Sequence, residues 1–253
     1  MKILAADTST AVLSIALCEM TQRNDAAYAS SDPEQPNVLT MAEATLDCGR
    51  VHTERLLEVV DWLLGHMGIP MDAVDLLAIS KGPGSFTGLR VGVAAWKGLA
   101  LSVGRPLIGV PTLDAMTRLG PFFSGFVCPL LDARMKEVFG AVYRFDAGRR
   151  SKVTPDLVCP VDDILNALDA CEGPLFFLGD GAKLYQDRIR ARFPEISLFP
   201  GECVAPKASA VAREGAALWT SGAPSDAALL TPVYLRKSQA EEARKKATLC
   251  KTV

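Results

Sequence analysis

Histidine is scarce in this chain: only two of its 253 residues are histidines, His52 and His66. They are not spaced as H-x-x-x-H or H-E-x-x-H, the patterns that place two imidazoles on one helix face to bind zinc. We therefore expect no histidine-built metal site. The chain also lacks the G-x-S-x-G turn of serine hydrolases, the G-x-x-x-x-G-K-[ST] phosphate loop and the G-x-G-x-x-G dinucleotide loop. No enzyme activity follows from these motifs.

A strong net charge and long apolar runs are also missing. The formal net charge is −2, so the whole molecule has no electrostatic reason to bind nucleic acid by itself. No stretch approaches the roughly 18 apolar residues that span a bilayer. The N-terminus reaches Asp7 before the apolar core of a signal peptide could form. We expect a folded, cytoplasmic protein that reaches any RNA through a partner.

Paired cysteines are absent, although the chain has seven cysteines. No two of them stand as C-x-x-C, and several lie in apolar runs. Scattered thiols in apolar surroundings predict reduced core cysteines rather than a disulfide framework or a zinc site. The seven are Cys18, Cys48, Cys128, Cys159, Cys171, Cys203 and Cys250.

Apolar periodicity predicts an α/β plan in the first half of the chain. Two strands joined by a polar turn precede a third strand, whose pattern also suits a helix, and then helices alternate with buried strands. The expected strands are 1–7, 11–19, 38–48, 75–80 and 107–110, the expected helices are 53–67 and 86–103, and 21–37 is expected to be a loop.

The second half repeats this order, which indicates two related lobes. We assign 1–106 to a first lobe and 107–207 to a second. The helix at about 208–222 is expected to return to the first lobe, and 236–253 to form a charged tail. In the second half the expected helices are 112–119, 161–170, 183–193 and 208–220, and the expected strands are 127–131, 137–145 and 175–178.

Two polar turns that follow apolar strands are candidates for a nucleotide-binding site. Small hydroxyls and backbone N–H groups in such turns can surround a phosphate, and a helix N-terminus favours an anion. The same residue types are also common in ordinary turns, where they serve geometry alone. The candidate residues are Asp7, Thr8 and Ser9 in the first turn and Gly179, Asp180 and Gly181 in the second.

The segment KGPGSFTGLR, from Lys81 to Arg90, superficially suggests a phosphate loop. However, Phe86 projects a ring where a nucleotide needs bare backbone. Gly88 and Gly92 leave a smooth strip on the following helix, although each costs about 0.5–1 kcal/mol relative to alanine. Close packing against another surface would compensate for that cost. The strip faces either another helix or the core of this chain, and we favour docking of another helix.

The predicted helix at 53–67 extends this docking surface. Val59 and Trp62 add apolar area on a flank that would be solvated if the helix packed on one side only. We therefore predict that both helices contact a partner. The predicted contact residues are Leu56, Val59, Val60, Trp62, Leu63, Phe86, Leu89, Gly92, Val93 and Trp96.

Charged residues also gather in LDARMKE, where a strand is expected to end in a hairpin turn. Asp132 and Arg134, with Glu137 nearby, could supply an acid and a base. An ion pair across the hairpin turn is the simpler interpretation, because opposite charges at such spacing commonly pair at the surface. We therefore expect no catalytic residue here.

Five segments together resemble the TsaB family, also called YeaZ. The resemblance covers nearly the whole chain, and GPGSFTGLR is its most specific part. The loop 21–37 and the tail after Lys237 depart from the family pattern. The five segments are ILAADTST near the N-terminus, HTERLL at 52–57, KGPGSFTGLRVGVAAWKGLA at 81–100, PLLDARMKEVF at 129–139 and PVYLRK at 232–237.

The resemblance implies a two-lobed actin/Hsp70-like (ASKHA) fold and a role in making N6-threonylcarbamoyladenosine at position 37 of tRNAs that read ANN codons. In that system TsaD is the catalytic subunit, and TsaE is an ATPase that joins the complex. The resemblance implies a non-catalytic scaffold that pairs with TsaD through two helices of its first lobe, and with a second copy when alone. It implies no cofactor, no metal, and tRNA contact only through the complex.

Two other functions stay open at the level of the sequence. An ATP-binding phosphotransferase of the same fold class would use the two polar turns. A metallo-glycopeptidase is the least supported, since these residues provide no metal ligands for it. The basic cluster 244–246 could contact tRNA phosphates, although a solvated tail is the simpler interpretation.

Overall fold

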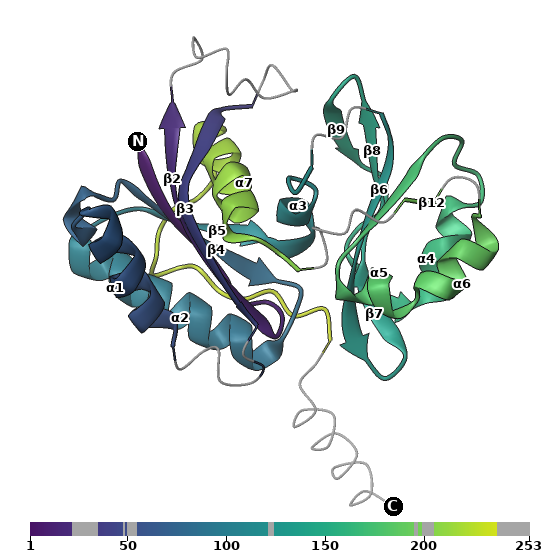
Figure 1. Cartoon of the computed structure of the whole chain (residues 1–253), viewed down its shortest axis with the longest axis horizontal. Helices are drawn as coiled ribbons and strands as arrows, with labels where there is room; N and C mark the ends of the chain where they lie inside the picture. The colour runs from purple at the N-terminus through teal and green to yellow at the C-terminus, as the bar shows by residue number, and fades with distance from the viewer. Residues whose placement is uncertain are drawn as a thin grey trace, which may run out of the picture.

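Two lobes, each built on its own β-sheet, lie side by side in the computed structural model (Figure 1). The structure describes residues 1–21, 35–47, 49, 55–120, 124–194, 197–198 and 205–236. The predicted loop 21–37 and the predicted tail 236–253 lie almost wholly outside these ranges. Among the described residues, no helix is both long enough and apolar enough to cross a membrane.

The first sheet has the strand order β3-β2-β1-β4-β5. β1 (Lys2–Asp7) pairs antiparallel with β2 (Val12–Thr21), which pairs with β3 (Asn37–Asp47), so the predicted hairpin and third strand are confirmed. β4 (Leu76–Gly82) runs parallel to β1, and β5 (Leu107–Pro111) runs parallel to β4. Because a helical crossover returns β5 to this sheet, the sheet extends past the lobe boundary that the sequence suggested.

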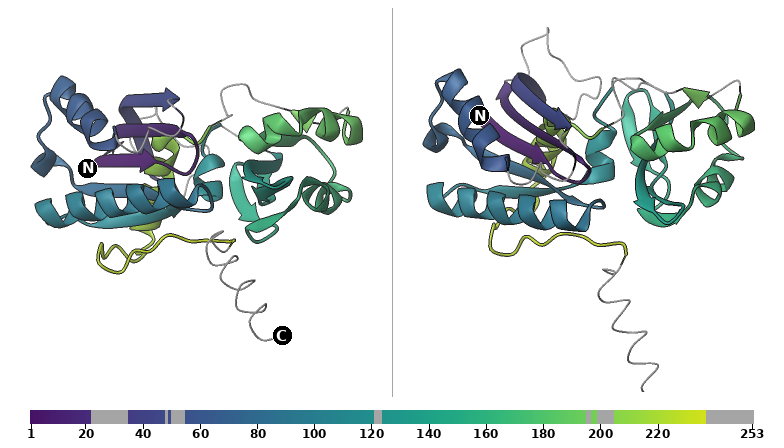
Figure 2. Two further views of the ribbon diagram at one scale, coloured as in Figure 1. Left: turned by 90° about the horizontal axis from the view of Figure 1, so that it is seen from below. Right: turned by 60° about the horizontal axis from the view of Figure 1, so that its bottom comes forward.

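Helices bury both faces of the first sheet (Figures 1 and 2). α1 (Leu56–Met67) and α2 (Phe86–Val103) pack on one face and form one apolar core with it. A short 3₁₀ helix (Met71–Ala73) separates α1 from β4. α7 (Ala208–Thr220) returns from the end of the chain to cover the opposite face. Its small residues, such as Ala212, allow it to lie close to the strands.

The second sheet has the order β10-β7-β6-β11-β12, and β8 and β9 extend it beside β6. Its strands are β6 (Gly125–Arg134), β7 (Glu137–Gly140), β8 (Tyr143–Asp146), β9 (Arg149–Lys152), β10 (Leu157–Pro160), β11 (Leu175–Leu178) and β12 (Ser197–Leu198). Its helices are α4 (Val161–Leu168), α5 (Asp180–Leu184) and α6 (Gln186–Arg192). α3 (Thr112–Met116) packs its apolar side on this sheet, so it joins the second lobe to the chain before it.

Several predicted elements of the second lobe need correction. The expected strand 137–145 is two strands, because the start of β6 pairs with β8 while its end pairs with β7. The expected helix 183–193 is interrupted at Tyr185, which separates α5 from α6. The short strands β9, β10 and β12 were not predicted, since two to four residues carry too little periodicity to be recognised.

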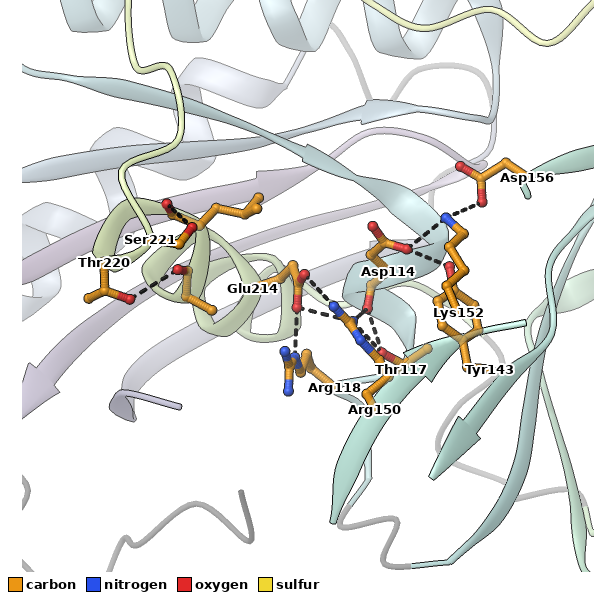
Figure 3. A network of polar contacts seen from close by, with 12 residues as sticks. Asp114, Thr117, Arg118, Tyr143, Arg150, Lys152, Asp156, Glu214, Thr220 and Ser221 are labelled. Atoms are coloured by element: carbon orange, nitrogen blue, oxygen red, sulfur yellow. Dashed lines mark hydrogen bonds and ion pairs between the residues drawn. The ribbon is translucent and has the colours of Figure 1, made fainter. Parts of the chain in front are cut away.

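A buried cluster of ion pairs joins the two lobes (Figure 3). Glu214 of α7 is 3% exposed and accepts hydrogen bonds from Arg118 Nε at 2.7 Å and Arg150 Nη2 at 2.7 Å. Arg150 lies on β9, so this contact connects the second lobe to α7 of the first. Burial alone would lower the pKa of Arg150, but the Glu214 carboxylate holds that pKa above its ordinary value. Two guanidinium groups therefore share one buried carboxylate.

Asp114 of α3 forms the adjoining part of this junction (Figure 3). Its carboxylate accepts a hydrogen bond from the Tyr143 hydroxyl at 2.5 Å and from Lys152 Nζ at 2.9 Å. Lys152 also pairs with Asp156 at 2.7 Å. Since Arg150 Nη1 donates to the Asp114 carbonyl at 2.9 Å, both parts act as one network.

We expect Glu214→Gln to lower the free energy of unfolding by about 3–5 kcal/mol, because two buried guanidinium groups would lose their carboxylate. Urea unfolding at pH 7 measures the loss. The matched control is Arg188→Gln, which removes the exposed Arg188–Asp162 pair and should cost no more than about 1 kcal/mol. Equal losses in the two variants would contradict the importance of the buried cluster.

Candidate docking surface

The first polar turn is closed by its own hydrogen bonds. The Asp7 carboxylate accepts from Ser9 N at 2.9 Å and Ser9 Oγ at 2.7 Å, and the Ser80 hydroxyl also donates to it. Asp7 and Thr8 are fully buried, and Ser9 is 2% exposed. This carboxylate is therefore used to hold the turn against β4.

The start of α2 lies directly on that turn. Ser85 N donates to Ser9 O at 2.6 Å, and Ser85 Oγ caps the helix by accepting from Gly88 N at 3.3 Å. A Cβ added at Gly88 would overlap the Thr8 carbonyl, and one at Gly92 would overlap the Thr8 hydroxyl. The prediction that this glycine strip receives another helix is therefore wrong. The strip faces the core of its own chain. A side chain at Gly88 or Gly92 would push α2 away from the turn.

The second polar turn is equally enclosed. Gly179 and Gly181 lie against the backbone of β6 at Leu130, with no room for a side chain. Asp180 Oδ1 accepts from Asp132 N at 3.0 Å, which fixes the start of α5 to the end of β6. Burial raises the pKa of Asp180 above its ordinary value, and the nearby Asp132 carboxylate adds to the rise. These contacts give the predicted nucleotide-loop residues structural roles.

Most of the predicted docking residues lie on the buried faces of α1 and α2. Periodicity located the helices correctly, but the largest apolar side chains on them face the sheet. Only Trp62 is exposed, at 55%, and Phe86 is half-buried. The eight buried residues are Leu56, Val59, Val60, Leu63, Leu89, Gly92, Val93 and Trp96.

The opposite faces of α1 and α2 form an exposed surface, which we call the outer face. It combines large apolar side chains with small residues and a few charges. Leu57 is 53% exposed and Leu101 is 66% exposed, values that are high for leucine in a helix. The outer face comprises Leu57, Glu58, Asp61, Trp62, Gly65 and His66 of α1, and Thr87, Arg90, Val91, Ala94, Gly98 and Leu101 of α2.

Contacts within the chain do not explain two glycines on the outer face. A Cβ added at Gly65 or Gly98 would meet no atom within 4 Å. Alanine at either helical position would stabilise the helix by about 0.5–1 kcal/mol, so the fold itself does not require glycine there. Gly65 lines a shallow hollow of about 510 Å³. The side chains around this hollow are Glu58, Asp61, Trp62 and His66.

Charge differs between the two helices of the outer face. α1 presents Glu58 and Asp61, whereas α2 has no acidic residue and presents Arg90. The Arg90 guanidinium lies over the Phe86 ring at 5.1 Å, and that ring packs on Tyr234 at 4.6 Å. One helix is thus acidic and the other basic.

The charged hairpin residues form ion pairs, but the prediction of a pair across the turn between β6 and β7 is wrong. Arg134 pairs with Asp132 at 3.1 Å beside the turn between β6 and β7, whereas Glu137 pairs with Arg236 from the end of the described chain. Among the described residues, no three histidine, cysteine, aspartate or glutamate side chains gather where they could hold a metal ion. The described cysteines are free thiols, and burial raises the pKa of Cys18 to about 11.

Comparison with known proteins gives consistent matches over most of the chain. A family model, TsaD: tRNA N6-adenosine threonylcarbamoyltransferase, matches residues 46–244. A Bacillus subtilis protein named tRNA threonylcarbamoyladenosine biosynthesis protein TsaB is 31% identical over 75% of each chain. An Escherichia coli protein of the same name is 30% identical over 95% of this chain and 96% of that one.

A solved structure, YeaZ from Pseudomonas aeruginosa, has a TM-score of 0.72 to this chain. It is 27% identical and is aligned over 92% of this chain and 99% of its own. The chain has two sheets, each with helices packed beside it. The prediction of an actin/Hsp70-like fold is therefore confirmed.

We expect Gly92→Ala to lower the free energy of unfolding by about 1–3 kcal/mol, because its Cβ would overlap Thr8. Gly98→Ala is the matched control on the same helix, and it should raise stability by up to about 1 kcal/mol. Urea unfolding of both variants measures the difference. Equal effects on stability would contradict the close approach of α2 to the turn.

Asp180→Asn keeps an oxygen acceptor for Asp132 N and removes a buried charge. A carboxyl whose pKa is raised by folding destabilises the fold increasingly as pH rises through its unfolded and folded pKa values. We therefore expect the variant to be more stable than the natural chain at pH 7, and this advantage to shrink as pH falls toward about 4. Urea unfolding across this range measures it, and an advantage that grows toward acid pH would contradict the assignment.

Proposed function

Because this chain belongs to the TsaB family, we propose that it is a non-catalytic scaffold subunit of the assembly that makes N6-threonylcarbamoyladenosine at position 37 of ANN-reading tRNAs. Its proposed partners are a TsaD-like catalytic subunit and a TsaE-like ATPase, and its proposed location is the cytoplasm, where the tRNA is. With a net charge of −2, contact with tRNA is proposed to occur only through the complex.

The outer face of α1 and α2 is the observation that carries this proposal. Exposed Trp62, Leu57 and Leu101 offer apolar area, and tryptophan is among the residues that contribute most at interfaces. Gly65 and Gly98 leave the surface low enough for another helix to come close. Neither feature improves the stability of the isolated chain. A partner that packs on this face gives both features a role.

A partner with the same fold suits the charges of the outer face. A family model named for TsaD matches this chain, so a TsaD-like subunit would present two helices in corresponding positions. A two-fold arrangement then places α1 of each chain near α2 of the other. Acidic Glu58 and Asp61 would face a helix that in this chain carries Arg90. The same arrangement serves a second copy, so we propose a homodimer when the chain is alone.

The ATP-binding alternative has less support. The Asp7 carboxylate is satisfied by neighbouring serines, and Thr8 is covered by α2. A phosphate at this turn would require α2 to move away from it. The metallo-glycopeptidase alternative also lacks a supporting observation, since the described residues bring no set of metal ligands together.

Gly98→Arg and Trp62→Asp test the proposal by placing charge on the outer face. We expect either change to weaken binding to the TsaD-like subunit of the same organism by about 30-fold or more, because both disturb the middle of an apolar contact. Calorimetric titration measures affinity, and reconstituted tRNA modification with purified subunits measures function.

Leu184→Arg is the matched control, because Leu184 is 59% exposed on α5 of the second lobe. It should bind and support modification normally. Undiminished binding and modification with Gly98→Arg would overturn the proposed docking surface.

A further inference from the structure

The last described segment, residues 226–236, crosses from one lobe to the other as an extended strap (Figure 2). It follows α7, runs beside α2 of the first lobe, and ends at the second lobe. Leu107 N donates to Ser225 O at 3.0 Å where the strap begins. Its irregular backbone makes few hydrogen bonds of its own, so other elements hold it in place.

Contacts with the first lobe hold the middle of the strap. Lys97 Nζ of α2 donates to Ala228 O at 3.0 Å and Leu230 O at 3.1 Å. A Cβ added at Gly109 of β5 would overlap the Leu230 side chain. These contacts fix the middle of the strap between α2 and the edge strand β5.

The far end of β4 holds the next part of the strap. Val233 N donates to Lys81 O at 2.6 Å, and a Cβ added at Gly82 would overlap the Val233 carbonyl. The Tyr234 ring then packs on Phe86 at the start of α2. Backbone, glycine and aromatic contacts together anchor the strap to the first lobe as far as this point.

Arg236 at the end of the strap binds the second lobe. Arg236 Nη1 donates to Ala133 O at 2.8 Å, and its guanidinium pairs with Glu137. Both acceptors flank the turn between β6 and β7. Arg236 is thus the contact through which the strap holds the second lobe, and we call the Arg236–Glu137 pair the clasp.

The Glu214 network and the clasp differ in their exposure to water. The Glu214 side chain at the junction is 4% exposed, with Arg118 at 13% and Arg150 at 17%. In the clasp, the side chains of Arg236 and Glu137 are 21% and 33% exposed. Salt and water weaken partly exposed ion pairs far more than buried ones. The clasp is therefore the weaker of the two connections.

We propose that the strap is a releasable clamp between the lobes. The buried Glu214 network acts as the fixed side of the junction, and the clasp at Arg236 sets how closely the β6–β7 hairpin approaches the first lobe. Opening the clasp lets the second lobe turn about the Glu214 side without unfolding either lobe. The clamp goes beyond the proposed function, since it requires no partner.

Arg236→Gln in the full chain tests the clamp by two measurements. We expect a larger radius of gyration by small-angle X-ray scattering, and amide exchange in residues 137–140 about threefold faster or more, because this hairpin would lose its tie. The urea midpoint should stay close to that of the natural chain. Raising sodium chloride to about 0.5 M should have the same effects on the natural chain, because the clasp is partly exposed.

Two further variants separate the clasp from general loss of charge. Arg134→Gln removes the Asp132–Arg134 pair of the same hairpin, which lies within one lobe, and should change neither measurement. Exchanging the charges, with Arg236→Glu and Glu137→Arg together, should restore both toward natural values. Unchanged scattering and exchange in Arg236→Gln, or equal changes in Arg134→Gln, would overturn the proposal.

Discussion

The contact between α2 and the turn at Thr8 determines much of this structure. Because Gly88 and Gly92 carry no side chain, the helix lies directly on the Thr8 backbone and hydroxyl. The turn itself is held closed by the buried Asp7 carboxylate, which accepts hydrogen bonds from Ser9 and Ser80. It also decides which side of α2 meets solvent. One close approach therefore covers Thr8 and leaves the outer face of α2 in solvent.

The outer face is presented by a lobe that is tied to its neighbour in two ways. Glu214 pairs with two arginines at a buried junction, and Arg236 of the strap pairs with Glu137 of the second lobe. The strap also contacts α2, through Lys97 and Phe86. The helix proposed to meet a partner is thus in contact with the segment that holds the second lobe.

The sequence predicted the strands and helices of the first lobe well, because their apolar periodicity is long and regular. It failed to separate β7 from β8, since both strands carry the same alternation while pairing with different parts of β6. It located α1 and α2 correctly but selected their buried faces for docking. In a helix as apolar as α2, spacing alone does not tell which glycine faces outward. The contact of Glu214 with Arg150 joins residues 64 positions apart, so no local pattern could have revealed it.

The fluorescence of Trp62 offers the most direct test of the docking surface. Trp96 is fully buried, so in a Trp219→Phe background acrylamide should quench mainly Trp62, which is 55% exposed. The measurement compares quenching of the chain alone with quenching after saturation by a tryptophan-free TsaD-like subunit. If the outer face docks that subunit, quenching of Trp62 should fall to the level of a buried tryptophan. Formation of the complete complex with unchanged quenching of Trp62 would contradict the account.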